Sequence, residues 1–461
     1  MRPIEIKRRR HWQQHIRDNA YQVEALTNQT IGYWTEALAV PYAIQLSEGE
    51  EEALSKATEA LWEMSCEFLD RFFTEESPGA VTSRLKTLGI LPEYHRAIAS
   101  SWAREAPEDL ELATRFDLAT RNQALGDISG SELSIKLIEI NGETPLLGAE
   151  MVYQWNWFCN YRSQFPSGDK ALPDDAYQFN EYWEKIANRF RVLANACDFK
   201  GRGVSFLVDE TLEEDLEMAM QLIQILHDEV DDQIYTQIVT LRDDYDEDGK
   251  LISRGIGLDS EGYLVDGQND RMPIIWKIYD WHNIQADMAS DRSTTALVNR
   301  LEKDDISDQI IIEPLWKQVL SNKGAMVYMW QWFRNHPTYG QYLLPTYFET
   351  DLSMEATQLA VGIHIRKPII GHEGVGISIL DPAVGDIEAK PALGYGEEGY
   401  ILQEFFELPV AALGQQRQHY MIGAWSVDGE AAGIVIRGDG SRITGRYCTI
   451  IPHIVAGAIQ V

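Results

Sequence analysis

Apolar and polar positions alternate with helical spacing through the first hundred or so residues. From Leu54 to Phe68 the apolar residues recur every three or four positions, which predicts an amphipathic helix. Its start is expected at Ser47, because Glu50 three residues later completes the pattern of a capping box. A second amphipathic helix is expected at residues 12–23. The pattern therefore predicts a helical N-terminal region.

Further along the chain the apolar runs become shorter. Residues 115–119 and 133–140 are short alternating or apolar stretches, separated by a polar stretch that contains two glycines, and together they predict a β-hairpin. A strand at residues 204–208, a helix at 212–226 and a strand at 234–239 follow. This order predicts a β-α-β unit with a parallel sheet.

The last part of the chain is strand-like. Residues 313–332 predict one helix, and strands are expected at residues 274–279, 362–368, 376–380, 399–406, 420–427 and 433–436. The dipeptides Asp428-Gly429 and Asp439-Gly440 are typical of tight hairpin turns. No low-complexity linker and no repeat of fixed period separates these segments. We therefore expect one interlocked α/β protein.

Composition and charge limit the partners. The 461 residues include 40 Lys and Arg and 72 Asp and Glu, so the net charge is −32. This balance argues against a DNA or RNA binder, which needs a basic surface, and fits a small cationic partner or simple solubility. The basic cluster at residues 7–10 is interpreted as a solvated helix start that offsets nearby acids.

Apolar runs and cysteines limit the location. No apolar run reaches the roughly 18 residues of a membrane span, so no membrane partner is expected. The four cysteines are far apart and form no Cys-x-x-Cys pair, which argues against a disulfide framework or a zinc site. The basic N-terminus is not followed by the apolar stretch of a secretory signal. A cytoplasmic location is therefore expected.

Three oxygen-bearing side chains of the predicted hairpin are candidate metal ligands. Glu139 and Asn141 are two residues apart on a strand and so share one face, and Asp117 on the paired strand could join them. Such hard oxygen ligands suit Mg²⁺, which usually completes its octahedron with phosphate oxygens. The alternative is that the three residues form the polar outer face of a hairpin.

A lysine followed by a glycine-rich turn is a candidate phosphate site. Lys367 ends a strand and precedes Gly371, Gly374 and Gly376. Glycines let backbone N–H groups approach phosphates, but the spacing matches neither a Walker loop nor a dinucleotide fingerprint. A flexible lid or an ordinary hairpin turn remain alternatives. On residues alone, Lys323 could equally be a solvated lysine, and the ten scattered histidines show no metal-ligand spacing.

Taken together, the motifs resemble the ATP-grasp synthetase domain of the glutathionylspermidine synthetase family, and most closely its stand-alone bacterial acid–amine ligases. The resemblance runs nearly end to end. It rests on Trp12 and on residues 115–117, 138–141, 144–145, 275–281, 313–316, 321–323, 335–337, 343–345, 366–374, 402–404, 422–425 and 437–453.

The resemblance implies an α/β (α+β) fold: a circularly permuted ATP-grasp with a helical N-terminal region and a pre-ATP-grasp-like α/β subdomain. The implied parts are residues 1–112 (helical), 113–200 (metal-binding hairpin), 201–300 (pre-ATP-grasp-like) and 301–461 (lid and nucleotide-binding part). The implied magnesium ligands are Asp117, Glu139 and Asn141. The implied ATP-binding residues are Arg115, Lys323, Lys367, Glu373, Gly374, Leu402, Gln403, Glu404, Phe405 and Arg437, with Arg115 at the reacting phosphate and substrate carboxylate.

The implied activity is an ATP- and Mg²⁺-dependent ligase that joins a small-molecule acid to an amine through an acyl phosphate. A glutathione-like or peptide acid and a polyamine-like amine are expected substrates. Some positions depart from the family pattern: Gly142-Glu143 replaces Ala-Asp, His372 replaces Arg, and Asp280 lies within a Tyr-Pro-Trp-Glu-type segment. These departures motivate an alternative, a nucleotide-binding sensor or scaffold without catalysis.

Overall fold

The computed structural model describes residues 1–19, 31–103, 107–122, 133–209, 212–241, 243–245, 250–288, 301 and 309–457. Its largest sheet has six antiparallel strands in the order β21-β20-β19-β3-β4, with β18 paired to β19. These strands are β3 (Thr114–Asn122), β4 (Leu133–Asn141), β18 (Val410–Leu413), β19 (Gln416–Val427), β20 (Glu430–Asp439) and β21 (Thr449–Ile451). Strands from the predicted parts 113–200 and 301–461 thus share one sheet.

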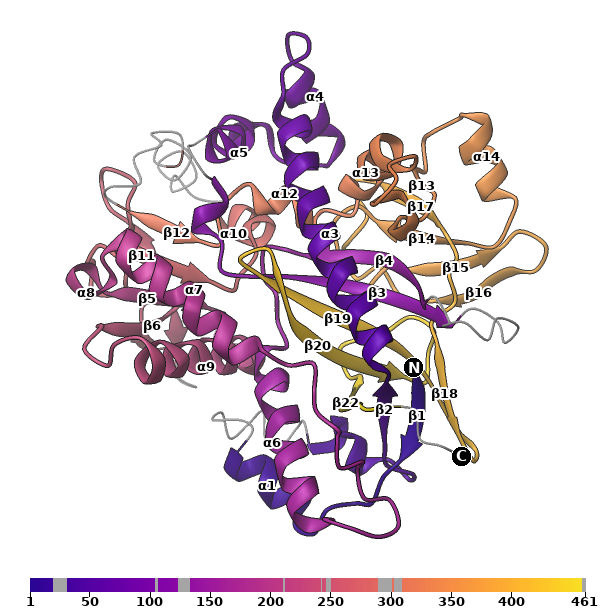
Figure 1. Cartoon of the computed structure of the whole chain (residues 1–461). Coiled ribbons are helices and arrows are strands. Elements are labelled where there is room, and N and C mark those ends of the chain that lie inside the picture. The colour runs from indigo at the N-terminus through magenta and orange to yellow at the C-terminus, as the bar shows by residue number, and fades with distance from the viewer. Residues whose placement is uncertain are drawn as a thin grey trace.

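The two faces of this sheet are covered by different helices. Helix α3 (Glu48–Phe73) packs on one face and crosses the front of the sheet in Figure 1. Helices α6 (Gly148–Gln164) and α7 (Tyr182–Cys197) pack on the other face. Along β20, Ile434 and Ile436 join the core under α3, and Val435 joins the core under α6 and α7. Successive side chains of β20 therefore point to opposite faces of the sheet and pack into two different apolar layers.

Several local predictions are confirmed. Helix α3 begins after Ser47, whose hydroxyl accepts the Glu50 N–H while the Glu50 carboxylate accepts the Ser47 N–H. Strands β3 and β4 pair as the expected hairpin. Asp428 and Gly429 both have positive φ angles and connect β19 to β20 in a two-residue turn. The Asp439-Gly440 prediction is wrong, because residues 440–448 form a longer loop before β21.

The N-terminal region is not only helical. It contains α1 (Trp12–Asn19), α4 (Ala80–Thr87) and α5 (His95–Trp102), but also β1 (Arg2–Glu5) and β2 (Tyr42–Leu46). These strands form a three-stranded sheet with β22 (His453–Val455), about 400 residues away in sequence. Every residue of β2 is buried. Residues 20–23 of the expected helix 12–23 lie outside the described residues.

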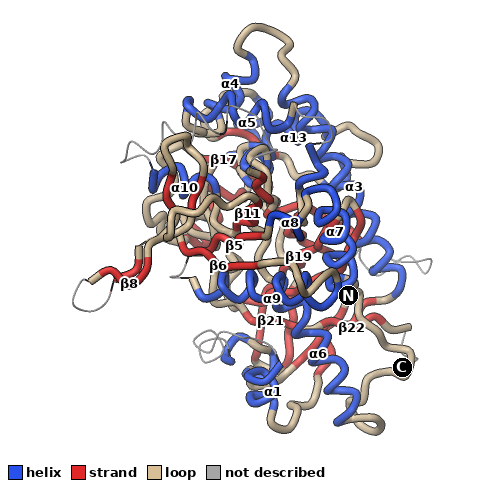
Figure 2. Tube along the Cα trace, turned by 90° about the vertical axis from the view of Figure 1, so that its left-hand side faces the viewer, coloured by secondary structure: helices blue, strands red, loops and turns tan. Residues whose placement is uncertain are grey.

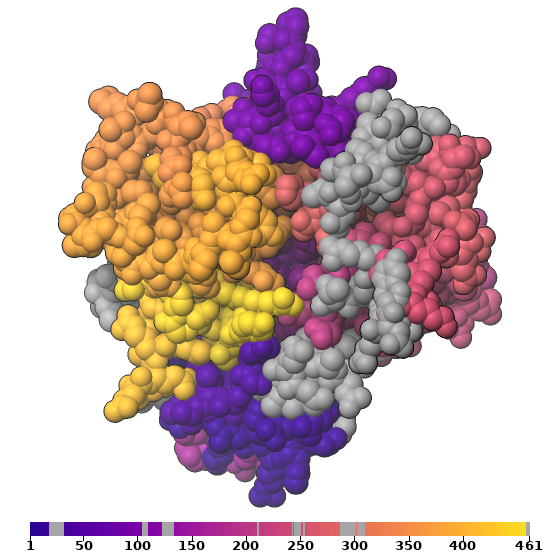
Figure 3. Space-filling view, turned by 180° about the vertical axis from the view of Figure 1, so that it is seen from behind, coloured from indigo at the N-terminus to yellow at the C-terminus, as the bar shows by residue number. Residues whose placement is uncertain are grey.

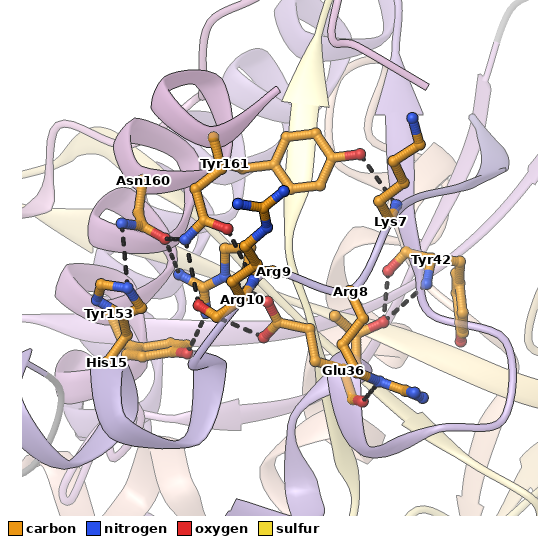
Figure 4. A network of polar contacts seen from close by, with 12 residues as sticks. Lys7, Arg8, Arg9, Arg10, His15, Glu36, Tyr42, Tyr153, Asn160 and Tyr161 are labelled. Carbon is orange, nitrogen blue, oxygen red and sulfur yellow. Dashed lines mark hydrogen bonds and ion pairs between the residues drawn. The ribbon is translucent and has the colours of Figure 1, made fainter. Parts of the chain in front are cut away.

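The interpretation of the basic cluster as solvated is confirmed for the exposed Arg8 and Arg10 and is wrong for Arg9. Arg9 is 3% exposed and pairs with the buried Glu36. Its Nη2 also donates to the Tyr153 hydroxyl at 2.7 Å, and Arg8 donates to the carbonyl oxygens of Glu36 and Leu38. Figure 4 shows these side chains between the N-terminal segment and α6. Arg9 therefore anchors the N-terminal segment from inside, because Glu36, the acid that it pairs with, is also buried.

The expected β-α-β unit is confirmed within a four-stranded parallel sheet of order β12-β11-β5-β6. Its strands are β5 (Val204–Val208), β6 (Thr236–Thr240), β11 (Ile274–Lys277) and β12 (Ile310–Ile312), with helices α8 (Phe199–Arg202), α9 (Glu213–Glu229) and α10 (Trp281–Met288) nearby. Two small hairpins, β7 (Asp244–Tyr245) with β8 (Leu251–Ser253) and β9 (Gly257–Leu258) with β10 (Leu264–Val265), complete this part. Figure 2 shows β8 projecting from the body.

A five-stranded antiparallel sheet of order β13-β17-β14-β15-β16 forms the remaining part. Its elements are β13 (Thr346–Phe348), β14 (His364–Pro368), β15 (Ser378–Asp381), β16 (Gly385–Ala389), β17 (Tyr400–Glu404) and α14 (Met354–Ala360). The described 3₁₀ turns are η1 (Ile31–Tyr33), η2 (Thr35–Ala37), η3 (Pro92–Tyr94), η4 (Pro107–Leu110) and η5 (Gly340–Tyr342). None of the described helices is both long and apolar enough to cross a membrane.

The single helix expected at residues 313–332 is wrong. The structure has two helices, α12 (Lys317–Ser321) and α13 (Ala325–Phe333). Asn322 between them has an extended backbone, with ψ at 123°, and its side chain bonds the Leu88 carbonyl and the Gly324 N–H. An asparagine side chain that bonds backbone groups competes with helical hydrogen bonds. The break is where Lys323 leaves the helical path.

Candidate active site

A cavity of about 390 Å³ lies where the three large sheets meet. Its wall combines the open end of the β3–β4 hairpin, the start of α9, the segment after β11, the loop after β14 and the loop between β20 and β21. Figure 3 shows the C-terminal residues on one side of the molecule and the residues of the four-stranded sheet on the other. Segments from distant parts of the sequence therefore build one site.

Cationic side chains gather around the hairpin. Arg115 Nε lies 3.1 Å from Asp117 Oδ1, and Arg437 Nη2 lies 2.6 Å from Asp117 Oδ2. Asn141 donates its side-chain N–H to the same Oδ2 at 3.0 Å. The fully buried Asp117 carboxylate therefore holds two guanidinium groups beside the cavity, which both arginines line.

The two predicted lysines lie on either side of Glu139. Lys323 Nζ is 3.3 Å from Glu139 Oε2, and Lys367, which is 2% exposed, donates to the Ile138 carbonyl at 2.9 Å. Burial lowers the pKa of Lys367 to about 8, although the Glu139 carboxylate opposes that shift. Burial raises the pKa of Glu139, but Lys323, Lys367 and Arg437 outweigh it and bring that pKa to about 2.

Four cations therefore surround two carboxylates, Asp117 and Glu139, and leave an excess of positive charge at the cavity. We call Arg115, Lys323, Lys367, Arg437, Asp117 and Glu139 the cationic cluster. Buried charge of one sign is costly unless a partner neutralises it. The arrangement is suited to an anionic ligand.

The glycine-rich loop after β14 closes over the cavity. Gly371 accepts a hydrogen bond from Lys323 Nζ at 2.5 Å. Gly374 has φ at +75°, and a Cβ there would lie 2.6 Å from the Thr444 carbonyl oxygen, so only glycine fits. Glu373 lies 3.8 Å from Arg446 on the β20–β21 loop. The loop is thus held against two other walls of the site.

A second group of lining residues is acidic, and we call it the acidic wall. Its members are Glu143, Glu150, Glu214, Asp215 and Asp280. Burial raises the pKa of Glu214 to about 7, although Arg446 opposes the shift. Burial also raises the pKa of Asp215 to about 8, and neighbouring carboxylates add to that effect. Positive charge placed here would favour the ionised forms of these acids.

Sequence reasoning missed this acidic wall. Glu214 and Asp215 lie in the first turn of α9, directly after the carboxyl end of β5. Ligands of open α/β sheets bind at the carboxyl ends of the strands, so the predicted β-α-β unit contained a usable signal. Asp280 carried the same signal, because it follows the expected strand at residues 274–279, which is β11 of this parallel sheet. Glu143 carried no comparable signal, because only the tertiary fold brings it to the cavity.

The predicted site residues divide into three groups. Those that line the cavity are Arg115, Glu139, Asn141, Lys323, Glu373, Gly374 and Arg437. Asp117 and Lys367 lie directly behind the lining, in contact with it. Leu402, Gln403, Glu404 and Phe405 lie outside the lining; Gln403 Oε1 accepts from Lys367 Nζ at 2.8 Å. Adenine binding by this last segment stays a prediction.

The oxygen ligands expected for Mg²⁺ fit that ion in part. Glu139 and Asn141 face the cavity, and because Asn141 uses its nitrogen on Asp117, its oxygen remains available. The Asp117 oxygens already accept from Arg115, Arg437 and Asn141. In the described part of the chain, no group of three or more His, Cys, Asp or Glu side chains is placed to hold a metal ion. The set suits an ion that arrives with phosphate oxygens.

Helix α12 and the residues before it hold both open ends of the hairpin. Glu313 accepts the N–H groups of Leu112 and Ala113 at 3.1 Å each, just before β3. Lys317 Nζ lies 2.6 Å from Glu111 Oε2, donates to the Ala113 carbonyl at 2.7 Å and pairs with Glu313. We call Glu111, Glu313 and Lys317 the Lys317 cluster; their side chains are at most 1% exposed.

Comparisons with known proteins show which proteins this chain resembles. The family model described as glutathionylspermidine synthase preATP-grasp matches residues 3–456. A Haemophilus influenzae protein named "Putative acid--amine ligase" is 26% identical over 439 residues, which cover 91% of this chain and 90% of that protein. A solved glutathione synthetase-like effector from Globodera pallida covers 90% of this chain and 89% of its own, with 11% identity and a TM-score of 0.48.

Two further relatives match over shorter stretches. Trypanothione synthetase of Crithidia fasciculata is 32% identical over 197 residues, 40% of this chain and 28% of that protein. The bifunctional glutathionylspermidine synthetase/amidase of Escherichia coli is 26% identical over 212 residues, 43% of this chain and 32% of that protein. The family match spans nearly the whole chain, and the relatives are named as ligases and synthetases. The chain therefore belongs to the glutathionylspermidine synthase family and is a ligase that forms carbon–nitrogen bonds.

Proposed function

We propose that the protein joins a carboxylic acid to an amine through an acyl phosphate made from ATP. The observation that carries the proposal is the charge of the cavity lining, which contains side chains of the cationic cluster around Glu139 and a separate group of carboxylates around Glu214 and Asp215. A triphosphate and a carboxylate fit the cationic cluster, and an ammonium group fits the acidic wall. The names of the relatives, which include acid–amine ligase and trypanothione synthetase, agree with an acid and an amine as the two substrates.

The cationic cluster would position and neutralise the reacting groups. An oxygen of the substrate carboxylate attacks the γ-phosphorus, the bond to the β-phosphate oxygen breaks, and ADP leaves. Phosphoryl transfer mainly needs positioning and charge stabilisation. We assign Lys323, Lys367 and Arg437 to the phosphates and Arg115 to the carboxylate and the transferred group.

When bound, magnesium would supply electrostatic stabilisation of the charge that develops during transfer. Glu139 and Asn141 would hold the ion from the cavity side. Asp117 would orient Arg115 and Arg437, because its carboxylate contacts both. The loop with Glu373 and Gly374 would exclude water from the acyl phosphate, which hydrolyses easily.

The acidic wall would receive the amine. Its nitrogen attacks the acyl carbon, phosphate leaves, and the amine loses two protons, one from the ammonium form and one from the new amide. Asp215 is 3% exposed, and its pKa of about 8 places it close to working pH for proton transfer. A polyamine-like amine and a glutathione-like or peptide acid are the proposed substrate classes, on the pattern of the relatives' names.

A coupled assay tests the proposal. Purified protein with ATP and Mg²⁺ should release ADP and phosphate only when a suitable acid and amine are both present, within a panel of glutathione, peptides, amino acids and polyamines. When hydroxylamine replaces the amine, with ATP, Mg²⁺ and the acid present, the acyl phosphate should be trapped as a hydroxamate. Release of AMP would contradict the acyl-phosphate route. Tight ATP binding by calorimetry without turnover on the panel would favour a sensor or scaffold instead.

The departure at Gly142-Glu143 gives the sensor alternative little support. Glu143 is 3% exposed, and its carboxylate accepts from Lys277 Nζ at 3.2 Å and from the Trp281 N–H. The residue is therefore built into the wall between the hairpin and α10. It has a defined place in the site.

A further inference from the structure

Ser321, the last residue of α12, lines the cavity and has an unusual set of hydrogen bonds. Its Oγ accepts the N–H of Gly142 at 3.2 Å and the N–H of Glu143 at 2.9 Å. A serine hydroxyl has two lone pairs and one proton. Because two backbone donors occupy the lone pairs, the proton points away from the hairpin.

No hydrogen bond within the described part of the chain uses this proton. Ser321 is part of the cavity wall. Two residues further on, Lys323 reaches the same cavity, with its Nζ held by Gly371 and Glu139. An unused donor and a lysine ammonium thus approach one space from adjacent positions of the chain.

We propose that Ser321 touches the substrate: its hydroxyl donates a hydrogen bond to an anionic oxygen at the reacting centre, either of the transferred phosphoryl group or of the acid's carboxylate. This inference rests on the proposed ligase function. The two backbone donors polarise the hydroxyl and strengthen its own donation. A donor fixed in this way needs little reorganisation when charge develops on the oxygen.

The surrounding structure keeps this hydroxyl in place. The Lys317 cluster anchors the start of α12 to residues 111–113, and Ser321 anchors its end to residues 142–143. The helix is therefore tied to both open ends of the hairpin that bears Arg115 and Glu139. Ser321 lines the same cavity as these two side chains and Lys323.

Variants S321A and S321T test the proposal, with kinetics, melting temperature and calorimetry measured for each. S321A should lower kcat by about 100-fold, as loss of one oxyanion donor does. It should also lower the melting temperature, because the N–H groups of Gly142 and Glu143 lose their acceptor. S321T keeps the hydroxyl and should recover most of the activity. If S321A does not fold, S321C takes its place, because a thiol donates only weakly.

Calorimetry identifies the oxygen that is contacted. With the β,γ-imido analogue of ATP and with ADP as probes, weaker binding of the analogue alone by S321A indicates the γ-phosphoryl oxygen. Unchanged nucleotide binding with a lower kcat/KM for the acid indicates the carboxylate. The proposal is overturned if S321A turns over like the wild type, or if S321T is as impaired as S321A. A wild-type protein that binds neither probe would instead overturn the proposed function.

Discussion

The cationic cluster and the Lys317 cluster are both buried groups of charged residues, yet they differ in balance and surroundings. In the Lys317 cluster one lysine lies between two carboxylates, and further contacts go to backbone groups and to the Thr114 hydroxyl. In the cationic cluster four cations outnumber two carboxylates beside a cavity. Buried ion pairs alone therefore do not mark a functional site. A functional site is indicated by an excess of one charge beside a cavity that can hold a ligand.

The difference also separates two physical roles. Removing one member of a buried ion group leaves an uncompensated charge, so a closed cluster should affect stability first. An open cluster is completed by its ligand, so its loss should affect binding and turnover first. Three experiments test this separation, from the largest expected effect to the smallest.

Lys317→Met should lower the free energy of unfolding by about 3–5 kcal/mol, because two buried carboxylates lose their cation. Urea denaturation measures this loss. The folded fraction should still bind ATP with nearly wild-type affinity. Lys56→Met is the matched control, because its ion pair with Glu52 is exposed, and it should leave stability nearly unchanged. If K317M stays stable but loses ATP binding, the two roles are not separate.

Lys323→Met should act in the opposite way. It removes a cation from the cavity wall, and kcat/KM for ATP should fall by about 10²–10³-fold, equivalent to roughly 3–4 kcal/mol of transition-state stabilisation. Differential scanning fluorimetry should show a melting temperature equal to or above that of the wild type, because the excess of positive charge decreases. A large loss of stability with unchanged kinetics would show that Lys323 acts as a structural charge, like the Lys317 cluster.

The pH dependence of stability gives the smallest effect. Burial raises the pKa of Glu313 from 4.5 to about 7, although Lys317 opposes the shift. Between these values the folded chain holds a proton that the unfolded chain has lost, so stability should fall as pH rises from about 5 to 7. The slope from this group is at most about 1.4 kcal/mol per pH unit.

Urea midpoints at pH 5, 6 and 7 for the wild type and Glu313→Gln measure this contribution. The amide does not titrate, so the variant should have the flatter profile. Asp215→Asn is the matched control from the cavity, measured in addition at pH 8. The pKa of Asp215 is also raised, to about 8, so this variant should flatten the stability profile up to about pH 8. Equal slopes for the wild type and E313Q would show that Glu313 does not titrate in this window.

Local patterns in the sequence predicted local structure well. The capping box at Ser47, the β3–β4 hairpin and the Asp428-Gly429 turn each depend on neighbouring residues, and all three are confirmed. The pairing of β1 and β2 with β22 could not be predicted in this way, because it joins opposite ends of the chain. The break at Asn322 depends on its contact with Leu88, which is 234 residues away.

For the site, the sequence indicated residues but not their arrangement. The resemblance named Arg115, Glu139 and Lys323, and the structure brings them to one cavity. The acidic wall was missed because its residues come from separate elements and match no motif. The circular permutation, the four domain boundaries and the adenine-binding segment stay predictions. Strand β12, at residues 310–312, joins the sheet of the predicted part 201–300, so that boundary does not coincide with the sheet.

The shortness of α12 has a consequence for the evolution and engineering of this protein. One residue inserted into the helix would rotate everything after it by about 100°. Ser321 would lose its two backbone partners, and Lys323 would turn away from Glu139. Length variation should therefore be rejected in α12, which a library of single-residue insertions would reveal.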